Sequence, residues 1–244
     1  MTKTHLIAQK AIRQYLPNID AGIGRDDTWV DPARGIQSRR QDYHLDPLEQ
    51  HVKRACDPCN RVWMGGIEND VATHVIALAK GEALRLDKQA ASSLALWATI
   101  VAMLRTTQDP GTPTFDPADA AIIRSTSELP PGYVVWLLRG EERWDFPTRH
   151  QRVHLSFRGA PKEPTHLTWF WVGQSVYMVS HPLVASVLST LNVFRDAVQI
   201  LAPHGDYPIE WPFRAQIQHS AMVELTSSFF RPRSGWRGFE PREG

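Results

Sequence analysis

The chain has only two cysteines among its 244 residues. A scaffold held together by disulfides needs several pairs, so that class is excluded, and a closely spaced pair in a reducing compartment is more often metal-binding or catalytic. No window approaches the roughly 18 consecutive apolar residues of a membrane span. The N-terminus also lacks the basic-then-apolar order of a secretory signal. We therefore expect a cytoplasmic protein that does not enter a membrane.

The chain also has no large excess of positive or of negative charge. The 27 lysines and arginines and the 26 aspartates and glutamates leave a net charge of +1. Such a chain has no global field to attract nucleic acid, so any basic surface must come from local clusters. Hydrophobic residues make up 42% of the sequence, which is enough to bury a core.

Two neighbouring stretches carry apolar residues at helical spacing. The first runs from Trp63 to Leu78 and is expected to end at Gly81, a typical residue after a helix. The second follows Asp87, a good N-cap, and places Leu94 and other apolar residues on one stripe. Together they predict a helical hairpin.

The segment from Asp109 to Pro117 is rich in proline and glycine, and it is the clearest break in the chain. A short helix is expected after it, over 118–126. The character then changes to strands rich in β-branched and aromatic residues. The C-terminal segments 208–213 and 231–244 are expected to lie on the surface. The predicted strands are 133–138, 151–157, 166–172 and 176–180.

Both cysteines lie in one motif, Cys56-Asp-Pro-Cys59, with Asn60 directly behind it. A thioredoxin-like redox site would need a buried parallel strand before the motif, and the residues at 48–55 are too polar for that. A structural zinc site takes four Cys or His ligands, and only one cysteine pair exists. Two thiols without metal remain an alternative. The upstream histidines that could complete a zinc site are His5, His44 and His51.

The stretch Thr4-His5-Leu-Ile-Ala-Gln9, followed by Cys56-x-x-Cys59-Asn60-x-x-Trp63-Met64 and a glutamate on the next helix, resembles the HNH (His-Me finger) nuclease family. It is most similar to a bacterial group with Glu-His early and Cys-x-x-Cys-Asn-x-Gly-Trp-Met later. The resemblance implies a β-hairpin and helix around one divalent metal, Mg²⁺ or Mn²⁺, with Zn²⁺ as an alternative. It also implies DNA as the partner.

The resemblance assigns roles to particular residues. His5 would be the general base that takes a proton from water, and Asn60 would be a metal ligand at the start of the helix. His51 stands where the family usually has the asparagine that orients the base. Cys56 and Cys59 would belong to a structural zinc site.

Two departures from the family pattern point to an alternative. Thr4 stands where the family has an acidic residue or a histidine that binds the metal, and threonine offers no charge to a hard cation. Family members with a zinc-stabilised finger also have a second Cys-x-x-Cys before the histidine, and here only Met1 to Thr4 precede His5. The alternative function is a catalytically silent module that binds nucleic acid or protein and keeps the finger as a scaffold.

Each residue near the motif also has a purely structural interpretation. Asn60 could be a helix N-cap. Trp63 is expected to be a buried anchor, and Glu68 an exposed or paired helix residue rather than a ligand.

Three further groups have more ordinary interpretations than binding sites. His150, Arg152 and His154 alternate along a predicted strand and are expected on an exposed face. The basic residues near the motif, beginning with Arg39 and Arg40, are diluted by acids, so a mixed-charge surface is expected. The aromatic run 169–171 is expected in the β core rather than as a platform for stacking bases.

These observations predict an α+β fold. Residues 1–110 would form an N-terminal ββα-metal (HNH-like) finger with a helical hairpin, and residues 111–244 a mainly β module of unknown role. The predicted function is an endonuclease that hydrolyses DNA phosphodiesters with one divalent metal ion. The sequence does not indicate an oligomeric state.

Overall fold

The computed structural model shows a mixed helix and sheet protein, as the α+β prediction requires. The structure describes residues 2–5, 23–31, 35–43, 51–55, 63–106, 116–143, 148–154, 164–181, 196–203 and 205–228. For the first four of these segments, only the backbone is described.

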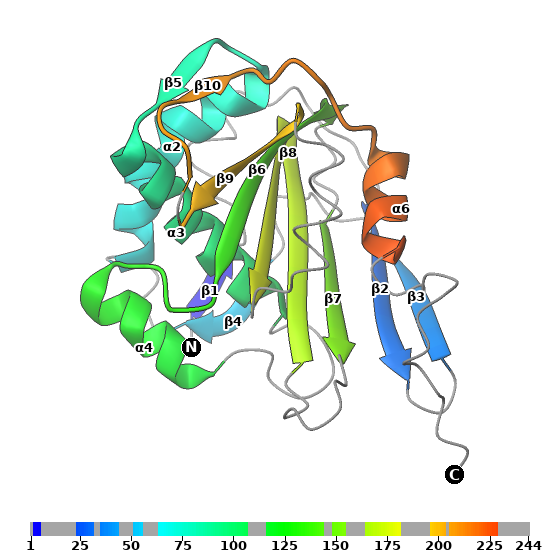
Figure 1. Cartoon of the computed structure of the whole chain (residues 1–244). Coiled ribbons are helices and arrows are strands. Elements are labelled where there is room, and N and C mark those ends of the chain that lie inside the picture. Colours follow the sequence, from blue (N-terminus) through cyan, green and yellow to red (C-terminus); the bar gives the residue numbers. More distant parts are fainter. Residues whose placement is uncertain are drawn as a thin grey trace, which may run out of the picture.

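A four-stranded antiparallel sheet, in the order β7-β8-β6-β9, forms the centre of the protein (Figure 1). Both faces of the sheet are buried. In β6, Val135 and Leu137 belong to one hydrophobic cluster, whereas Trp136 and Leu138 belong to another. Strands covered on both faces are apolar at nearly every position, and residues 134–138 of β6 show this pattern. The strands are β6 (Val134–Arg143), β7 (Thr148–His154), β8 (Pro164–His181) and β9 (Val198–Ala202).

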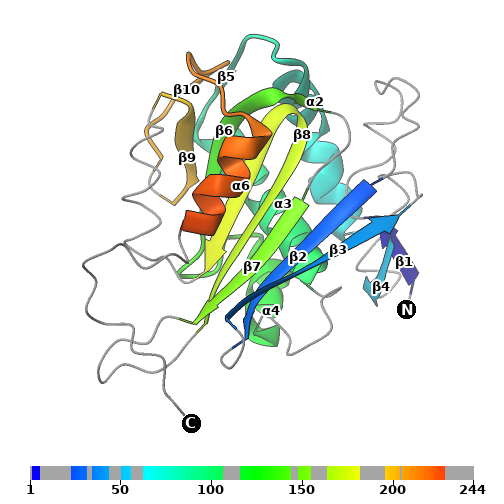
Figure 2. The same ribbon diagram turned by 90° about the vertical axis from the view of Figure 1, so that its right-hand side faces the viewer.

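Strand β8 folds back on itself at Gly173, which has a φ of 59°. Its first half pairs with β7 and its second half with β6, and the two halves run side by side (Figure 2). Within the turn, the Ser175 hydroxyl donates a hydrogen bond to the Val172 carbonyl at 2.8 Å. The turn sits against the end of a helix, because a Cβ at Gly173 would meet the carbonyl oxygen of Ala79.

Three helices match the sequence-based prediction closely. The first ends at Gly81, whose left-handed backbone (φ 72°) caps it. The second begins behind Asp87, whose carboxylate accepts the Ala90 N–H at 2.8 Å. Among the described residues, no helix is long and apolar enough to cross a membrane. The helices are α2 (Gly65–Lys80), α3 (Lys88–Thr106) and α4 (Pro117–Thr126).

Helices α2 and α3 cover one face of the sheet. Trp97 of α3 lies edge-on to Phe170 and Tyr177, with ring centroids 5.6 and 5.1 Å apart. The same cluster includes Val71 of α2 and Leu137 of β6. The hydrophobic core therefore runs across the division expected at residue 110.

The opposite face of the sheet carries Trp136, Trp169 and Trp171, all buried. The expectation that the aromatic run belongs to the β core is therefore confirmed. Helix α6 (His219–Ser228) crosses this face, as both views show (Figures 1 and 2), and its Met222 is fully buried there.

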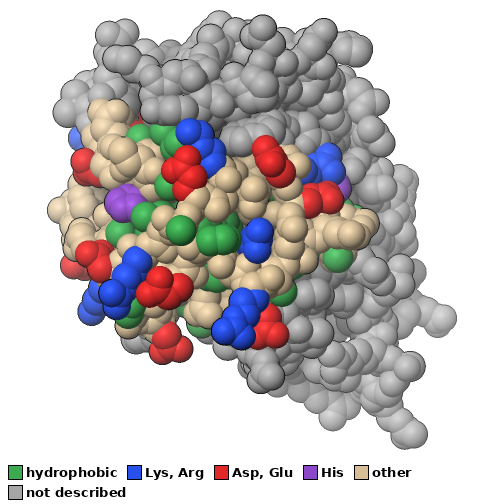
Figure 3. All heavy atoms as spheres, turned by 90° about the horizontal axis from the view of Figure 1, so that it is seen from above, with side chains coloured by type: hydrophobic (Ala, Val, Ile, Leu, Met, Phe, Trp, Pro, Cys, Tyr) green, Lys and Arg blue, Asp and Glu red, His purple; other side chains and the backbone are tan. Residues whose placement is uncertain are grey.

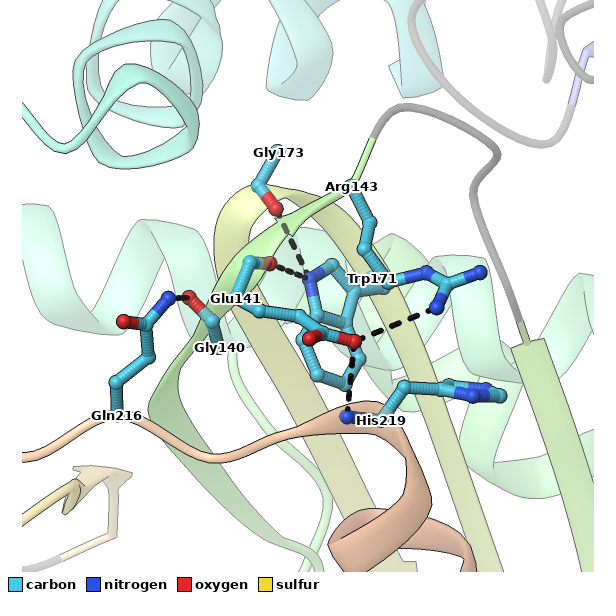
Figure 4. Close-up of polar contacts among 7 residues, drawn as sticks. All are labelled: Gly140, Glu141, Arg143, Trp171, Gly173, Gln216 and His219. Carbon is cyan, nitrogen blue, oxygen red and sulfur yellow. Dashed lines mark hydrogen bonds and ion pairs between the residues drawn. The ribbon is translucent and has the colours of Figure 1, made fainter.

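The start of α6 is held to the sheet by Glu141 of β6 (Figure 4). The Glu141 carboxylate accepts the backbone N–H of His219 at 3.1 Å and pairs with Arg143 at 3.3 Å. The side-chain amide of Gln216 donates to the Gly140 carbonyl at 2.8 Å. Because these polar groups satisfy one another, we interpret this cluster as a structural clamp rather than a binding site.

The expectation of a surface position for 208–213 was wrong. Ile209, Trp211 and Phe213 are buried, and β10 (Ile209–Trp211) pairs with β5 (Leu84–Leu86). The apolar residues alternate with polar residues and proline, so a single side of this segment faces the core. Residues 231–244 lie outside the described part of the chain.

The N-terminal strands form two separate two-stranded antiparallel sheets. One joins β1 to β4, and the other joins β2 to β3. The hairpin of β2 and β3 is inserted in the sequence between β1 and β4, and β2 lies beside β7 of the main sheet (Figure 2). These strands are β1 (Thr2–His5), β2 (Ile23–Asp31), β3 (Gly35–Tyr43) and β4 (His51–Ala55).

We predict that Gly173→Ala lowers the free energy of unfolding by at least about 2 kcal/mol, because it combines a left-handed backbone with a steric conflict at Ala79. Urea unfolding measures this change. Gly66→Ala is the control, since a Cβ there meets nothing within 4 Å and alanine favours a helix by about 0.5–1 kcal/mol. Equal stabilities for the two variants would contradict the described packing of the turn.

Candidate functional site

The antiparallel pairing of β1 with β4 brings two of the predicted site residues together. His5, the predicted base, is the Cα partner of His51, and Thr4 is the partner of Val52. At the other end of the pair, Thr2 is opposite Ala55. The two histidines are far apart in the sequence, and the hairpin of β2 and β3 lies between them.

The other three predicted site residues, Cys56, Cys59 and Asn60, lie outside the described residues. In the sequence, Cys56 directly follows Ala55, the last residue of β4.

Helix α2 begins a few residues after this motif, with Met64 in the N-cap position. No side chain caps the helix there. Asn60 lies outside the described residues, so its interpretation as an N-cap stays a prediction. Trp63 packs against the hydrophobic cluster that includes Met64 and Ile100, as expected of an anchor. Trp63 Nε1 is buried and has no hydrogen-bond partner among the described residues.

Glu68 is the titratable residue that sequence reasoning underestimated. It lies in the first turn of α2 and is half-buried, and the structure describes no ion pair or hydrogen bond for its carboxyl. Burial raises the pKa of this carboxyl from its ordinary value of 4.5 to about 7. The sequence contains a signal for the burial of Glu68, because at helical spacing this residue follows buried Met64 by one turn and precedes buried Val71 by one turn.

Two histidines of the main sheet, His150 and His166, form a structural pair. His150 of β7 and His166 of β8 stack with centroids 5.7 Å apart and an interplanar angle of 12°. The Nδ1 atom of His150 lies 2.7 Å from the hydroxyl of Thr168, its register partner. The expected exposed position was therefore wrong for His150, which is half-buried, whereas the side chains of Arg152 and His154 are not among those described.

Cations and anions are mixed wherever the structure describes them together. In the register of β2 and β3, Arg39 is opposite Asp27 and Arg40 is opposite Asp26. The described side chains on the face seen from above also mix blue and red (Figure 3). Among the described ion pairs, Arg85 pairs with Glu210 at 3.2 Å.

The described residues contain no group of three or more His, Cys, Asp or Glu that could hold a metal ion. The candidate site is therefore the pair of strands β1 and β4, with His5 opposite His51, and the predicted motif that follows them lies outside the described residues. Comparison of the chain with protein-family models, with curated proteins and with solved structures found no match.

The raised pKa of Glu68 makes a prediction about stability. The folded protein binds the proton of the Glu68 carboxyl more tightly than the unfolded chain does. The protonated carboxyl therefore contributes its full stabilisation of the folded state below pH 4.5, and this contribution is lost as the pH rises through about 7. Glu68→Gln should match the wild type near pH 4 and exceed its unfolding free energy at pH 8 by up to about 3 kcal/mol. Urea unfolding at both pH values tests this.

Asp70→Asn is the matched control, because Asp70 lies on the exposed side of the same helix. Its difference from the wild type should be small at both pH values. A pH-independent difference between Glu68→Gln and the wild type would contradict the description of Glu68.

Proposed function

We propose that this protein is an HNH-like endonuclease that hydrolyses DNA phosphodiesters with one divalent metal ion. The observation that carries the proposal is the register of β1 and β4, in which His5 is opposite His51. Directly opposed residues of an antiparallel pair belong to the same face of the ladder. The order of strand, strand and helix α2 is the order of an HNH finger.

In this proposal His5 is the general base. An imidazole with an ordinary pKa is largely neutral at pH 7 and can take the proton of a water molecule. The water oxygen forms a new bond to phosphorus, and the bond from phosphorus to the leaving oxygen breaks. His51, opposite His5, is proposed to hold the imidazole of the base in position.

A divalent ion would stabilise the charge on the leaving oxygen. Asn60 would bind it through the amide oxygen. Thr4 and its partner Val52 supply no charged oxygen beside His5, whereas Mg²⁺ is usually bound through carboxylates. Imidazole and amide donors therefore fit Mn²⁺ or Zn²⁺ better than Mg²⁺.

Cys56 and Cys59 are proposed to have a separate, structural role. The pair follows β4 and precedes α2 in the sequence, and the resemblance to zinc-stabilised fingers assigns the thiols to a structural site rather than to the reaction. A structural zinc ion bound there would need further ligands beside this one pair.

The alternative is a catalytically silent module that binds nucleic acid or protein. The observation that favours it is Thr4, which stands next to the proposed base and cannot replace an acidic metal ligand. Under this alternative the paired strands and α2 would remain as a scaffold. DNA binding without cleavage would be its signature.

Nicking of supercoiled plasmid in the presence of Mn²⁺ or Mg²⁺ tests the proposal. We expect cleavage by the wild type and a loss of about 10²–10⁴-fold in rate for His5→Ala, since a general base contributes that much. His51→Ala should lower the rate by a smaller factor. His74→Ala, which removes a histidine from the middle of α2, should leave the rate unchanged.

Equal cleavage by the wild type and His5→Ala would attribute the activity to a contaminant and exclude the nuclease assignment. No cleavage by any variant, together with retained DNA binding in a gel-shift assay, would favour the silent module.

A further inference from the structure

Arg139 of β6 is a half-buried cation whose one described side-chain partner is neutral. Its Nη1 atom donates a hydrogen bond to the backbone carbonyl of Phe213 at 2.7 Å. Its Nε atom is buried and has no hydrogen-bond partner among the described residues. The positive charge of this guanidinium is therefore not compensated by an ion pair in the described part of the chain.

The other arginines whose side chains are described differ from Arg139. Arg143 is also half-buried, and it pairs with Glu141 at 3.3 Å. The remaining ones are exposed, so water solvates their charges. An arginine that leaves water is ordinarily paired, because an uncompensated charge costs free energy there. The exposed arginines are Arg85, Arg124 and Arg214.

The hydrogen bond to Phe213 leaves one side of the guanidinium available. A guanidinium presents its N–H groups in pairs, and such a fork matches two oxygens of a carboxylate or a phosphate. Because Nη1 is taken by Phe213, the fork of Nε and Nη2 has no partner among the described residues. The side chain keeps part of its surface in solvent, so a small anion can reach it.

Two further side chains on this side of the sheet have buried donors. Tyr177 is the register partner of Leu137, two residues before Arg139, so it belongs to the same face. Trp211 packs edge-on against Phe213, with ring centroids 5.0 Å apart. The Tyr177 hydroxyl and Trp211 Nε1 have no hydrogen-bond partner in the described structure. Each of these groups can donate, as can Nε of Arg139, so the partner that they lack is an acceptor.

We infer that Arg139 is the centre of a binding site for a small oxyanion, such as phosphate or a carboxylate, which its Nε and Nη2 fork holds. The site lies on the face of the sheet that α2 and α3 cover, where Tyr177 and Trp211 offer further donors. No residue of β1 or β4 takes part, so the inference is independent of the proposed nuclease function.

Isothermal titration calorimetry of the full chain with sodium phosphate and with sodium acetate, at pH 7 and constant ionic strength, tests the inference. We expect saturable binding of phosphate, acetate or both, and the response to each anion shows whether a tetrahedral or a planar oxyanion is preferred. Arg139→Gln keeps a donor for Phe213 but removes the charge and the fork. It should raise the Kd by at least about tenfold. Arg85→Gln, the control at an exposed arginine, should stay within about twofold.

The Nε–H resonance of Arg139 in a ¹⁵N spectrum, identified by its absence from the Arg139→Lys variant, should shift when the anion is added. Absence of saturable binding by the wild type, or equal affinity for the wild type and Arg139→Gln, would overturn the inference. Binding that leaves the Nε–H resonance in place would also contradict it. If Arg139→Gln does not fold, Arg139→Lys decides. This variant keeps the charge without the fork, so it should bind more weakly, and an affinity equal to that of the wild type would reject the site.

Discussion

Burial of both faces of the central sheet is the constraint on which the rest of the structure depends. Helices α2 and α3 cover one face and α6 covers the other, so the central stretches of β6 and β8, at 134–138, 169–172 and 176–179, are apolar at every position. The C-terminal end of α2 is capped at Gly81 and packs against the turn at Gly173, which joins this helix to the sheet.

Local sequence patterns predicted those helices and strands that are determined by the residues of a single segment. The stripe from Trp63 to Leu78, the cap at Asp87 and the aromatic strands were all found from spacing and residue type. The segment 208–213 was missed because its prolines resemble a surface loop. Its burial depends on pairing with β5, which lies far away in the sequence, and no local pattern carries that information.

The candidate site, too, could be predicted only in part from the sequence. Its residue types were visible in the sequence, but the opposition of His5 and His51 is a property of strand register across a long insertion. Glu68 was underestimated because a glutamate on a helix is usually solvated. The spacing of Glu68 from Met64 and Val71 indicates its side of the helix, and the packing of α2 shows that both of these neighbours are buried.

The order of the chain has a consequence for its synthesis. Trp136, Trp169 and Trp171 are made well before α6, the helix that covers them. A nascent chain therefore presents a broad aromatic face until Glu141 can receive the start of α6. During that interval the face is open to other chains, so we expect α6 to protect the protein from aggregation as well as to stabilise the finished fold.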